Sequence, residues 1–400
     1  MPAWWVAGSA TTRIQPMKKA DVVICGGAVI GSAIAWNLGQ LAPELSVIVV
    51  ERDPTFEFSS TALSASGIRQ QFSNAINVAI SQFGVDFIRG AEARWGMDLN
   101  LREQGYLYLA NNAAGSQKLR DNHALQQAVG ADVTLLEPEV LAARFPYLNV
   151  DDLKLASLGL SGEGWFDSVG LMNGYQSNST ARRISGEITN LRVSHGKIQA
   201  VVLATGEEIA CGSFINAAGP RAAGIAQMAG IDLPVEPRKR TNFTFDCADP
   251  LASDLPLMID PSGVWARPEG RHFLCGCSPA NDPAVDHNDF EPRHAEFEDI
   301  IWPALAARSP KFEAIKVQRF WAGHYAYNTL DQNAVTGRHP EISNFIFANG
   351  FSGHGLQQSP AIGRGIAELV ALGAYKSLDL SPLGYERILN QNPLLERCVI

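Results

Sequence analysis

Apolar residues near the start of the chain follow two different spacings. Residues 21–25 form a short run rich in Val and Ile, and after a glycine-rich stretch the apolar positions of 34–38 recur at helical spacing. A second apolar run at 47–50 ends at Glu51. This succession predicts a strand, a turn, a helix and a second strand parallel to the first, which is a βαβ unit. The chain therefore opens as an α/β fold.

The remainder of the chain adds a second kind of pattern. Residues 74–95 carry a helical stripe, and 106–109 is typical of a buried strand. Short β-like runs with many prolines occupy 234–320, which predicts a second, sheet-containing domain. Residues 345–348 predict another buried strand, followed by a glycine-rich turn and a helix over 359–372.

Composition and charge narrow the classes of function. The formal net charge of -9 and the absence of a long Lys/Arg run argue against a nucleic-acid partner, because a phosphate-binding face needs clustered cations. Six cysteines are scattered without a CxxC pair, so neither a disulfide framework nor a metal site is expected. No apolar stretch reaches the roughly 18 residues of a membrane-spanning helix. We expect a cytoplasmic protein that acts on small molecules, with residues 1–16 as an extension before the fold.

The glycine-rich turn between the first strand and the first helix has the context of a dinucleotide-binding motif. Such a turn aims backbone N–H groups and the helix dipole at a pyrophosphate. Ala28 stands where the motif has its middle glycine, so its methyl group restricts the approach of the phosphates. Glu51, 20 residues past Gly31, is placed to accept hydrogen bonds from ribose hydroxyls. The hexapeptide alone would fit an ordinary strand-to-helix turn equally well, but together with Glu51 it favours a dinucleotide. Its residues are Gly26, Gly27, Ala28, Val29, Ile30 and Gly31.

Two later segments contain small residues where a cofactor would need them. Residues 214–220 are a buried strand that ends in small residues, a pattern that plain core packing explains at least as well. Residues 350–357 are more specific, because this density of glycines before a helix suits backbone amides placed against a flat polar ring such as a flavin. His354 has an alternative role as a surface or capping histidine, although its flanking glycines give it nothing local to pack on.

With these motifs the chain resembles the FAD-dependent D-amino acid oxidase superfamily, in the branch that contains sarcosine oxidase, glycine oxidase and dimethylglycine dehydrogenase. The resemblance covers about residues 20–382. It implies an α/β fold in which a Rossmann-like FAD-binding domain of the glutathione-reductase type is interleaved with an α+β substrate domain built on an antiparallel sheet. The implied FAD-binding domain is 17–95, 161–232 and 322–390, and the implied substrate-binding domain is 96–160 and 233–321.

The resemblance also implies which residues hold FAD. The glycine-rich turn and Glu51 would hold the ADP half, residues 60–68 would pass the isoalloxazine ring, and 353–357 would bind the pyrimidine edge. The implied cofactor-binding residues are Gly26, Gly27, Ala28, Val29, Ile30, Gly31, Glu51, Arg52, Ser60, Thr61, Ser64, Gly67, Ile68, Ile188, Ala217, Ala218, Gly219, Phe351, Gly353, His354, Gly355, Leu356 and Gln357.

Arg69 matches the arginine that pairs with the substrate carboxylate in sarcosine-oxidase-like proteins. A guanidinium fork suits that task because it can bind a carboxylate through two hydrogen bonds. The alternative is a surface or domain-bridging ion pair, which the polar neighbours Gln70 and Gln71 would tolerate.

The chain departs from the family pattern at three positions. The cysteine that attaches flavin covalently in sarcosine oxidases aligns near His324, so FAD is expected to be non-covalent. The lysine that activates dioxygen has no counterpart in 270–275, and a second carboxylate-binding lysine is replaced by Gln357. Dioxygen and another electron acceptor both remain open. The candidate catalytic residues are Arg69, His354 and, as sources of positive charge near the flavin, His272 and Arg267.

These observations lead to one expected function and two alternatives. The expected function is FAD-dependent oxidation of a small secondary amine or amino acid that carries a carboxylate, of the sarcosine or iminodiacetate type. Hydride would pass to flavin N5 and the imine would hydrolyse, as in an amine or amino acid oxidase or dehydrogenase. Similarity in 51–53, 67–73, 327–333 and 350–358 to flavoproteins that assist assembly of a respiratory complex implies a rival role with structural FAD. An NAD-dependent dehydrogenase is the third possibility, but it leaves the C-terminal glycine cluster unexplained.

Overall fold

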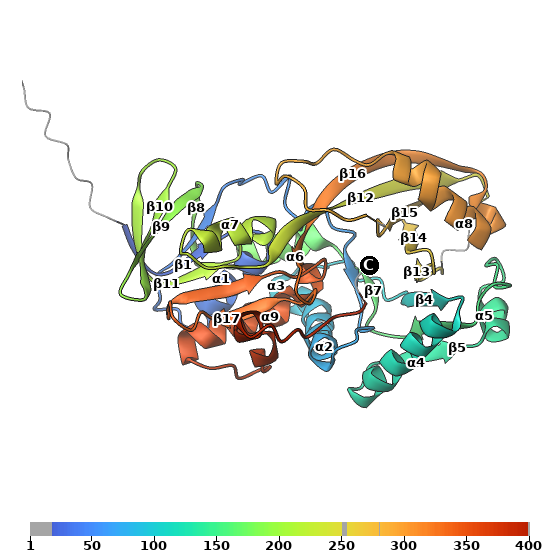
Figure 1. Ribbon diagram of the computed structural model, residues 1–400, viewed down its shortest axis with the longest axis horizontal. Helices are drawn as coiled ribbons and strands as arrows, with labels where there is room; N and C mark the ends of the chain where they lie inside the picture. The colour runs from blue at the N-terminus through green and yellow to red at the C-terminus, as the bar shows by residue number, and fades with distance from the viewer. Residues whose placement is uncertain (1–17, 250–253, 280, 399–400) are drawn as a thin grey trace, which may run out of the picture.

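The computed structural model describes residues 18–249, 254–279 and 281–398. The expected extension over 1–16 lies outside these residues. Two large sheets dominate the described part of the chain, and Figure 1 shows them side by side, with the first sheet on the left and the second on the right.

The first sheet contains the predicted βαβ unit. Strand β1 (Lys18–Cys25) is central and pairs in parallel with β2 (Val47–Glu51) and with β11 (Glu208–Asn216). These strands are buried on both faces, which explains their nearly continuous Val/Ile runs. Their order is β17-β18-β11-β1-β2-β8, and β10 and β9 extend from β11 as an antiparallel hairpin. The other strands are β8 (Arg182–Ser185), β9 (Ile188–Ser194), β10 (Lys197–Leu203), β17 (Val335–Arg338) and β18 (Phe345–Asn349).

Helices cover both faces of this sheet. On one face, α1 (Val29–Leu41) and α9 (Gly355–Leu372) share a buried core, and they approach so closely that a Cβ on Gly363 would lie 2.6 Å from the Cβ of Ala33. On the opposite face, α7 packs against a second core. The additional helices are α2 (Ala75–Arg89), α3 (Ala91–Trp95), α6 (Ser168–Ser177), α7 (Ala222–Gln227) and α10 (Glu386–Leu389), with 3-10 turns at Gly219–Arg221 and Ser381–Leu383.

Helix α9 begins four residues before the expected start at 359. The sequence favoured a later start because proline is preferred in the first turn, and Pro360 lies inside the observed helix. Pro360 has no N–H for the carbonyl of Leu356, and the hydroxyl of Ser359 donates a 2.8 Å hydrogen bond to that carbonyl instead. This local replacement lets the helix start at Gly355, directly after the glycine-rich turn.

The second sheet has the order β16-β12-β15-β14-β13-β4-β6-β5, and all its pairings are antiparallel except β13 with β4. Its core is rich in phenylalanine and lies under α5, α8 and a π-helical turn. Where short β-like runs were expected over 234–320, residues 235–247 form the single 13-residue strand β12. Its strands are β4 (Tyr106–Ala110), β5 (Val133–Leu136), β6 (Leu155–Gly159), β12 (Val235–Cys247), β13 (Leu257–Ile259), β14 (Val264–Glu269), β15 (His272–Cys277) and β16 (Ile315–Asn328). Its helices are α4 (Ala113–Ala128), α5 (Pro138–Arg144) and α8 (Trp302–Arg308), preceded by the π-helical turn Phe297–Ile301 and followed by a 3-10 turn at Pro310–Phe312.

A third, small sheet contains two strands. It pairs β3 (Gly67–Ile68) with β7 (Gly164–Trp165). The expected α/β fold with a largely antiparallel second sheet is confirmed. None of the helices in the described part of the chain has the length and apolarity that crossing a bilayer requires.

Candidate functional site

One large cavity lies where the first sheet meets the second. It contains about 2180 Å³ of space, its open mouth included. Its lining residues come from both sheets and from the segments that the sequence assigns to the cofactor, so the cavity extends along the region where the two sheets meet. The predicted site residues that line it are Gly26, Ala28, Val29, Ile30, Glu51, Arg52, Ser60, Thr61, Ser64, Gly67, Arg69, Ile188, Ala217, Ala218, Gly219, Phe351, Gly353, His354, Gly355, Leu356 and Gln357.

Three predicted cofactor residues lie just behind the cavity wall. A Cβ on Gly31 would lie 1.9 Å from the carbonyl oxygen of Gly26, so Gly31 is required for packing of the turn against the helix. The backbone N–H of Gly27 donates a 2.7 Å hydrogen bond to Glu51. Ile68 is fully buried in the core beside α1 and α9. These residues shape the wall and are not among those that line the cavity.

The glycine-rich turn presents the start of α1 to the cavity. Gly26 has φ +98°, a left-handed conformation, and a Cβ there would lie 2.4 Å from the carbonyl oxygen of Ala217. Ala28 occupies the N-cap position of α1 and has no side-chain cap, and although the amide of Val29 donates to Thr61, the next first-turn amide, that of Ile30, is available to an anion. This arrangement fits a pyrophosphate.

Glu51 is fixed at the end of β2 by two backbone amides. Gly27 N donates to one carboxylate oxygen at 2.7 Å, and Asp53 N donates to the other at 2.8 Å. Each oxygen retains a further lone pair. The carboxylate is therefore oriented toward the cavity and can accept hydrogen bonds from hydroxyl groups of a ribose.

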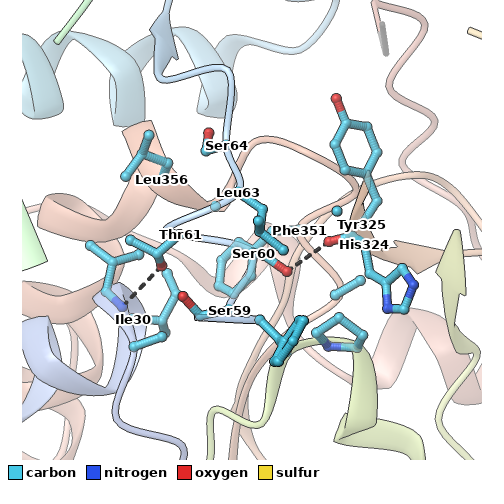
Figure 2. A pocket seen from close by; sticks show the side chains of 18 of the residues that line it. Ile30, Ser59, Ser60, Thr61, Leu63, Ser64, His324, Tyr325, Phe351 and Leu356 are labelled. Carbon is cyan, nitrogen blue, oxygen red and sulfur yellow. Dashed lines mark hydrogen bonds between the residues drawn. The ribbon is translucent and has the colours of Figure 1, made fainter. Parts of the chain in front are cut away.

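The loop 59–64 connects the two sides of the cavity, and Figure 2 shows it between Leu356 and His324. Thr61 accepts a 3.3 Å hydrogen bond from the backbone N–H of Val29 at the start of α1. Ser60 donates a 2.6 Å hydrogen bond to the carbonyl oxygen of His324 on β16. The loop is thus anchored at both ends across the region where the two sheets meet.

The segment before α9 brings backbone close to the cavity. Gly353 has φ +93°, and a Cβ there would lie 2.5 Å from the ring of Tyr325. Gln357 accepts a 2.6 Å hydrogen bond from the backbone N–H of Arg69, but its own amide nitrogen, Nε2, is buried and has no partner within 18–249, 254–279 and 281–398. An unpaired buried donor is costly. This donor fits the carbonyl-bearing pyrimidine edge of a flavin.

Arg69 is buried at the cavity wall beside His354. Its Nη2 donates to His354 Nε2 at 3.2 Å and also to the carbonyl oxygen of Cys398, and its Nε is buried without a partner among the residues that the structure describes. Burial, and then the charge of Arg69, lower the pKa of His354 to about 3. The imidazole is therefore neutral, and its Nε2 lone pair faces the guanidinium. The guanidinium also lies over the ring of Phe72, at 4.3 Å from its centroid.

The structure does not bring His272 or Arg267 to the cavity. His272 opposes Glu269 next to the turn that joins β14 and β15, the end of the hairpin away from the cavity, and its ring bonds to Asp246. Trp265 and Cys277, at the other end of the same hairpin, do line the cavity. Arg267 is fully engaged by protein groups, including the carbonyl oxygen of Ala65.

Arg240 lines the cavity and was not predicted from the sequence. It makes a bidentate pair with Asp282, both distances being 2.8 Å, and lies over the ring of Tyr325. The signal that could have found it is the run of three cations at 238–240 within a predicted strand region. Each of these cations is neutralised by its own carboxylate, from Glu236, Asp289 and Asp282 respectively.

Tyr106 is a second unpredicted wall residue. A Cβ on Gly67 would lie 1.8 Å from its hydroxyl oxygen, so glycine at 67 makes room for this phenol. Burial raises the pKa of Tyr106 well above its usual value, so the phenol stays protonated. Tyr106 and Arg69 both line the cavity, and the Arg69 guanidinium lies 6.0 Å from the centre of the Tyr106 ring.

Glu163 supports the backbone that follows Arg69. Its fully buried carboxylate accepts hydrogen bonds from Gln70 N at 2.7 Å and from Gln71 N at 3.0 Å, and a third at 2.8 Å from Gln71 Nε2. Burial is the largest influence and raises the pKa of Glu163 to about 7. Glu163 therefore titrates near neutral pH while it holds the segment that carries Arg69.

This titration predicts a pH dependence of stability. The folded-state pKa of about 7 lies above the ordinary value of 4.5, so the folded protein binds this proton more tightly than the unfolded chain. The resulting stabilisation is fully present below pH 4.5 and is lost as the pH rises through 7. Denaturant unfolding of the protein and of Glu163→Gln should show the difference between their unfolding free energies falling across that range. Parallel pH profiles would contradict this assignment.

The site combines two features of one class of protein. A helix N-terminus and a strand-end carboxylate are arranged for a dinucleotide, and a buried guanidinium lies further along the same cavity. A dinucleotide-dependent oxidoreductase is the class that this fold and site define. A family model described as FAD dependent oxidoreductase, DAO, matches residues 21–369. The chain belongs to this DAO family of FAD-dependent oxidoreductases, and its cofactor is FAD.

Individual relatives agree with this assignment. The chain is 40% identical to FAD-dependent oxidoreductase domain-containing protein 1 of Xenopus laevis over 96% of this chain and 86% of that protein. It is 24% identical to sarcosine oxidase subunit beta of Rhizobium meliloti over 93% and 88% of the two chains. The structure of L-proline dehydrogenase from P. horikoshii superposes with a TM-score of 0.83 at 25% identity, over 94% and 99%.

Proposed function

We propose that this protein oxidises a small secondary amine or amino acid that carries a carboxylate. The observation that supports this most directly is Arg69, a buried guanidinium in the wall of the cavity that also holds the FAD-binding segments. A charge buried at this depth needs a partner of opposite charge to offset its desolvation. Among the described residues no carboxylate contacts Arg69, so a substrate carboxylate is the partner that we infer.

Each part of the chain has a separate task in this proposal. The start of α1 and Glu51 hold the pyrophosphate and ribose, and Gln357 donates to the pyrimidine edge. Arg69 binds the substrate carboxylate, and the neutral ring of His354 holds the guanidinium in place. Bound flavin supplies the redox chemistry by accepting hydride at N5. The protein contributes orientation and exclusion of water, so no strong side-chain base is required.

The charges of the cavity favour a substrate with a single carboxylate. Iminodiacetate carries a second carboxylate, and the two residues that were expected to supply positive charge near the flavin, Arg267 and His272, both lie outside the cavity. Arg240 does line it but is already neutralised by Asp282. Two relatives carry names that specify sarcosine and L-proline, which are secondary amines with one carboxylate. We therefore place N-alkyl glycines and cyclic imino acids ahead of iminodiacetate.

Anaerobic bleaching of the flavin absorbance tests the proposal. Purified holoprotein is mixed with sarcosine, L-proline, iminodiacetate, D-amino acids and 2-hydroxy acids in turn. We expect bleaching by sarcosine or L-proline and not by 2-hydroxy acids. Bleaching by none of these compounds would count against an enzyme and favour the rival role, an assembly flavoprotein with structural FAD. Reoxidation of the bleached protein by dioxygen, compared with a quinone, would then identify the electron acceptor.

The environment of His324 predicts that FAD is not covalently attached at this position, so that denaturing the protein releases the cofactor. His324 is held by a 2.7 Å hydrogen bond between its Nε2 and the carbonyl oxygen of Asp289, and its ring stacks on Phe290. Burial lowers the pKa of His324, so its ring is neutral. The hydrogen bond to Asp289 and the stacking on Phe290 fix the position of this ring. Acid precipitation should leave all the flavin in the supernatant. Yellow protein in the pellet would contradict this prediction.

A further inference from the structure

The segment 394–398, which we call the C-terminal strap, crosses the start of α2 and ends against Arg69. Glu396 is its main anchor and is fully buried. Its carboxylate accepts hydrogen bonds from Ser73 N at 2.9 Å, Ser73 Oγ at 2.7 Å and Asn77 Nδ2 at 2.9 Å. At the other end of the strap, Cys398 contacts Arg69 and Asn122, which are far apart in the sequence. The strap thus returns the end of the described chain to the region between the two sheets.

The last described residue of the strap contacts the proposed carboxylate anchor. The carbonyl oxygen of Cys398 accepts a hydrogen bond from Arg69 Nη2. The same Nη2 donates to His354 Nε2 at 3.2 Å. Cys398 is also held by its N–H, which donates to Glu396 at 3.0 Å, and by Asn122, whose Nδ2 lies 3.1 Å from the Cys398 sulfur.

These contacts restrict what Arg69 can bind. A guanidinium has two edges that can bind a carboxylate through paired N–H groups, one formed by Nη1 with Nη2 and the other by Nε with Nη2. Nη2 belongs to both edges and has only two protons. With one acceptor in Cys398 and the other in His354, neither edge of Arg69 has its pair available.

We propose that the carbonyl group of Cys398 is an internal ligand of Arg69, and that a substrate carboxylate displaces it and the end of the strap on binding. This inference rests on the proposed function, because it takes Arg69 as the carboxylate anchor. A carboxylate can displace the carbonyl because hydrogen bonds between ionised partners are roughly twice as strong as those with a neutral acceptor. Neutral amines lack such a group, so the strap selects for substrates that carry a carboxylate.

The strap contains its own reporter. The Cys398 side chain is buried, and burial raises the pKa of its thiol to about 11, so it reacts slowly while the strap is closed. Cys211, which is partly exposed on the first sheet, serves as an internal reference. Labelling with N-ethylmaleimide, followed by mass spectrometry of the two peptides, therefore measures opening of the strap without any turnover.

The experiment compares acetate with acetamide, which has the same shape and no charge, on the FAD-loaded protein. Binding is followed by the perturbation of the flavin absorbance spectrum. We expect acetate to perturb the spectrum and to accelerate labelling of Cys398 about tenfold, whereas acetamide should do neither. A tenfold change corresponds to the loss of the one hydrogen bond between Arg69 and the Cys398 carbonyl oxygen. A perturbed spectrum with unchanged labelling of Cys398 would overturn the strap while leaving the proposed function intact.

Two strap variants and one matched control complete the test. Lys118, exposed on α4, donates to the carbonyl oxygen of Arg397, and Lys118→Met should loosen the strap and lower the half-saturating acetate concentration about threefold. Arg120→Met removes a cation from the same helix without touching the strap and should change neither readout. Glu396→Gln weakens the main anchor and should have the larger effect. Binding of acetate only in the loosened variants would support the strap. Binding in none of them would overturn both proposals.

Discussion

Arg69→Met is expected to raise the KM for sarcosine or L-proline about 100-fold while leaving the flavin bound. The side chain would lose its charge-assisted hydrogen bonds to the substrate carboxylate, a loss of about 3 kcal/mol. The cofactor should remain because the residues arranged for the ADP half lie elsewhere in the cavity wall. Steady-state kinetics and the flavin content of the purified variant measure the two quantities.

Two further variants distinguish the contribution of the paired N–H groups of Arg69 from that of its positive charge. Arg69→Lys keeps a cation but not the paired N–H groups, so its KM should lie between those of the protein and of Arg69→Met, roughly tenfold above the former. Arg102→Met is the control, because Arg102 is exposed and is not among the residues that line the cavity. An unchanged KM in Arg69→Met would remove the carboxylate anchor from the proposal.

Local sequence patterns were sufficient to predict the backbone structure at the proposed dinucleotide end of the site. The apolar run, the glycine-rich turn, the helix and Glu51 are close in sequence, and their structure depends mainly on interactions within one βαβ unit. The same holds for the segment before α9, where the glycines determine the backbone path. In both places the residue types themselves specify the backbone conformation, so the sequence is informative without knowledge of the remainder of the fold.

The substrate end could not be predicted in this way, because it depends on contacts between distant segments. Arg240 is neutralised by Asp282, and Arg69 contacts Cys398, whose position 329 residues later in the chain no local pattern reveals. His272 is of a residue type that is common in active sites, but it lies at the end of its hairpin that is away from the cavity. Which end of a hairpin faces a cavity is decided by how the second sheet packs on the first, and an isolated strand pattern does not contain that information.

Gly31→Ala is expected to weaken FAD binding about 100-fold and to destabilise the fold by about 3 kcal/mol, near the upper end for overpacking. The added methyl group would lie 1.9 Å from the carbonyl oxygen of Gly26, so the turn must move away from α1. That movement would displace the first-turn amides that we propose as the pyrophosphate-binding groups. Fluorescence titration of the apoprotein with FAD and thermal unfolding measure both effects.

Gly224→Ala is the matched control for this prediction, because it makes the same chemical change in a helix without a clash. Apart from its chain neighbours and the backbone of α7 itself, no atom of the described residues lies within 4 Å of the position that a Cβ on Gly224 would occupy, and the residue is exposed on α7. Alanine has the better helix propensity, so this variant should gain about 0.5 kcal/mol and bind FAD normally. Equal FAD affinity in the two variants would show that close packing of the turn against α1 is not what holds the cofactor. The dinucleotide site would then depend on Glu51 and on the segment before α9 instead.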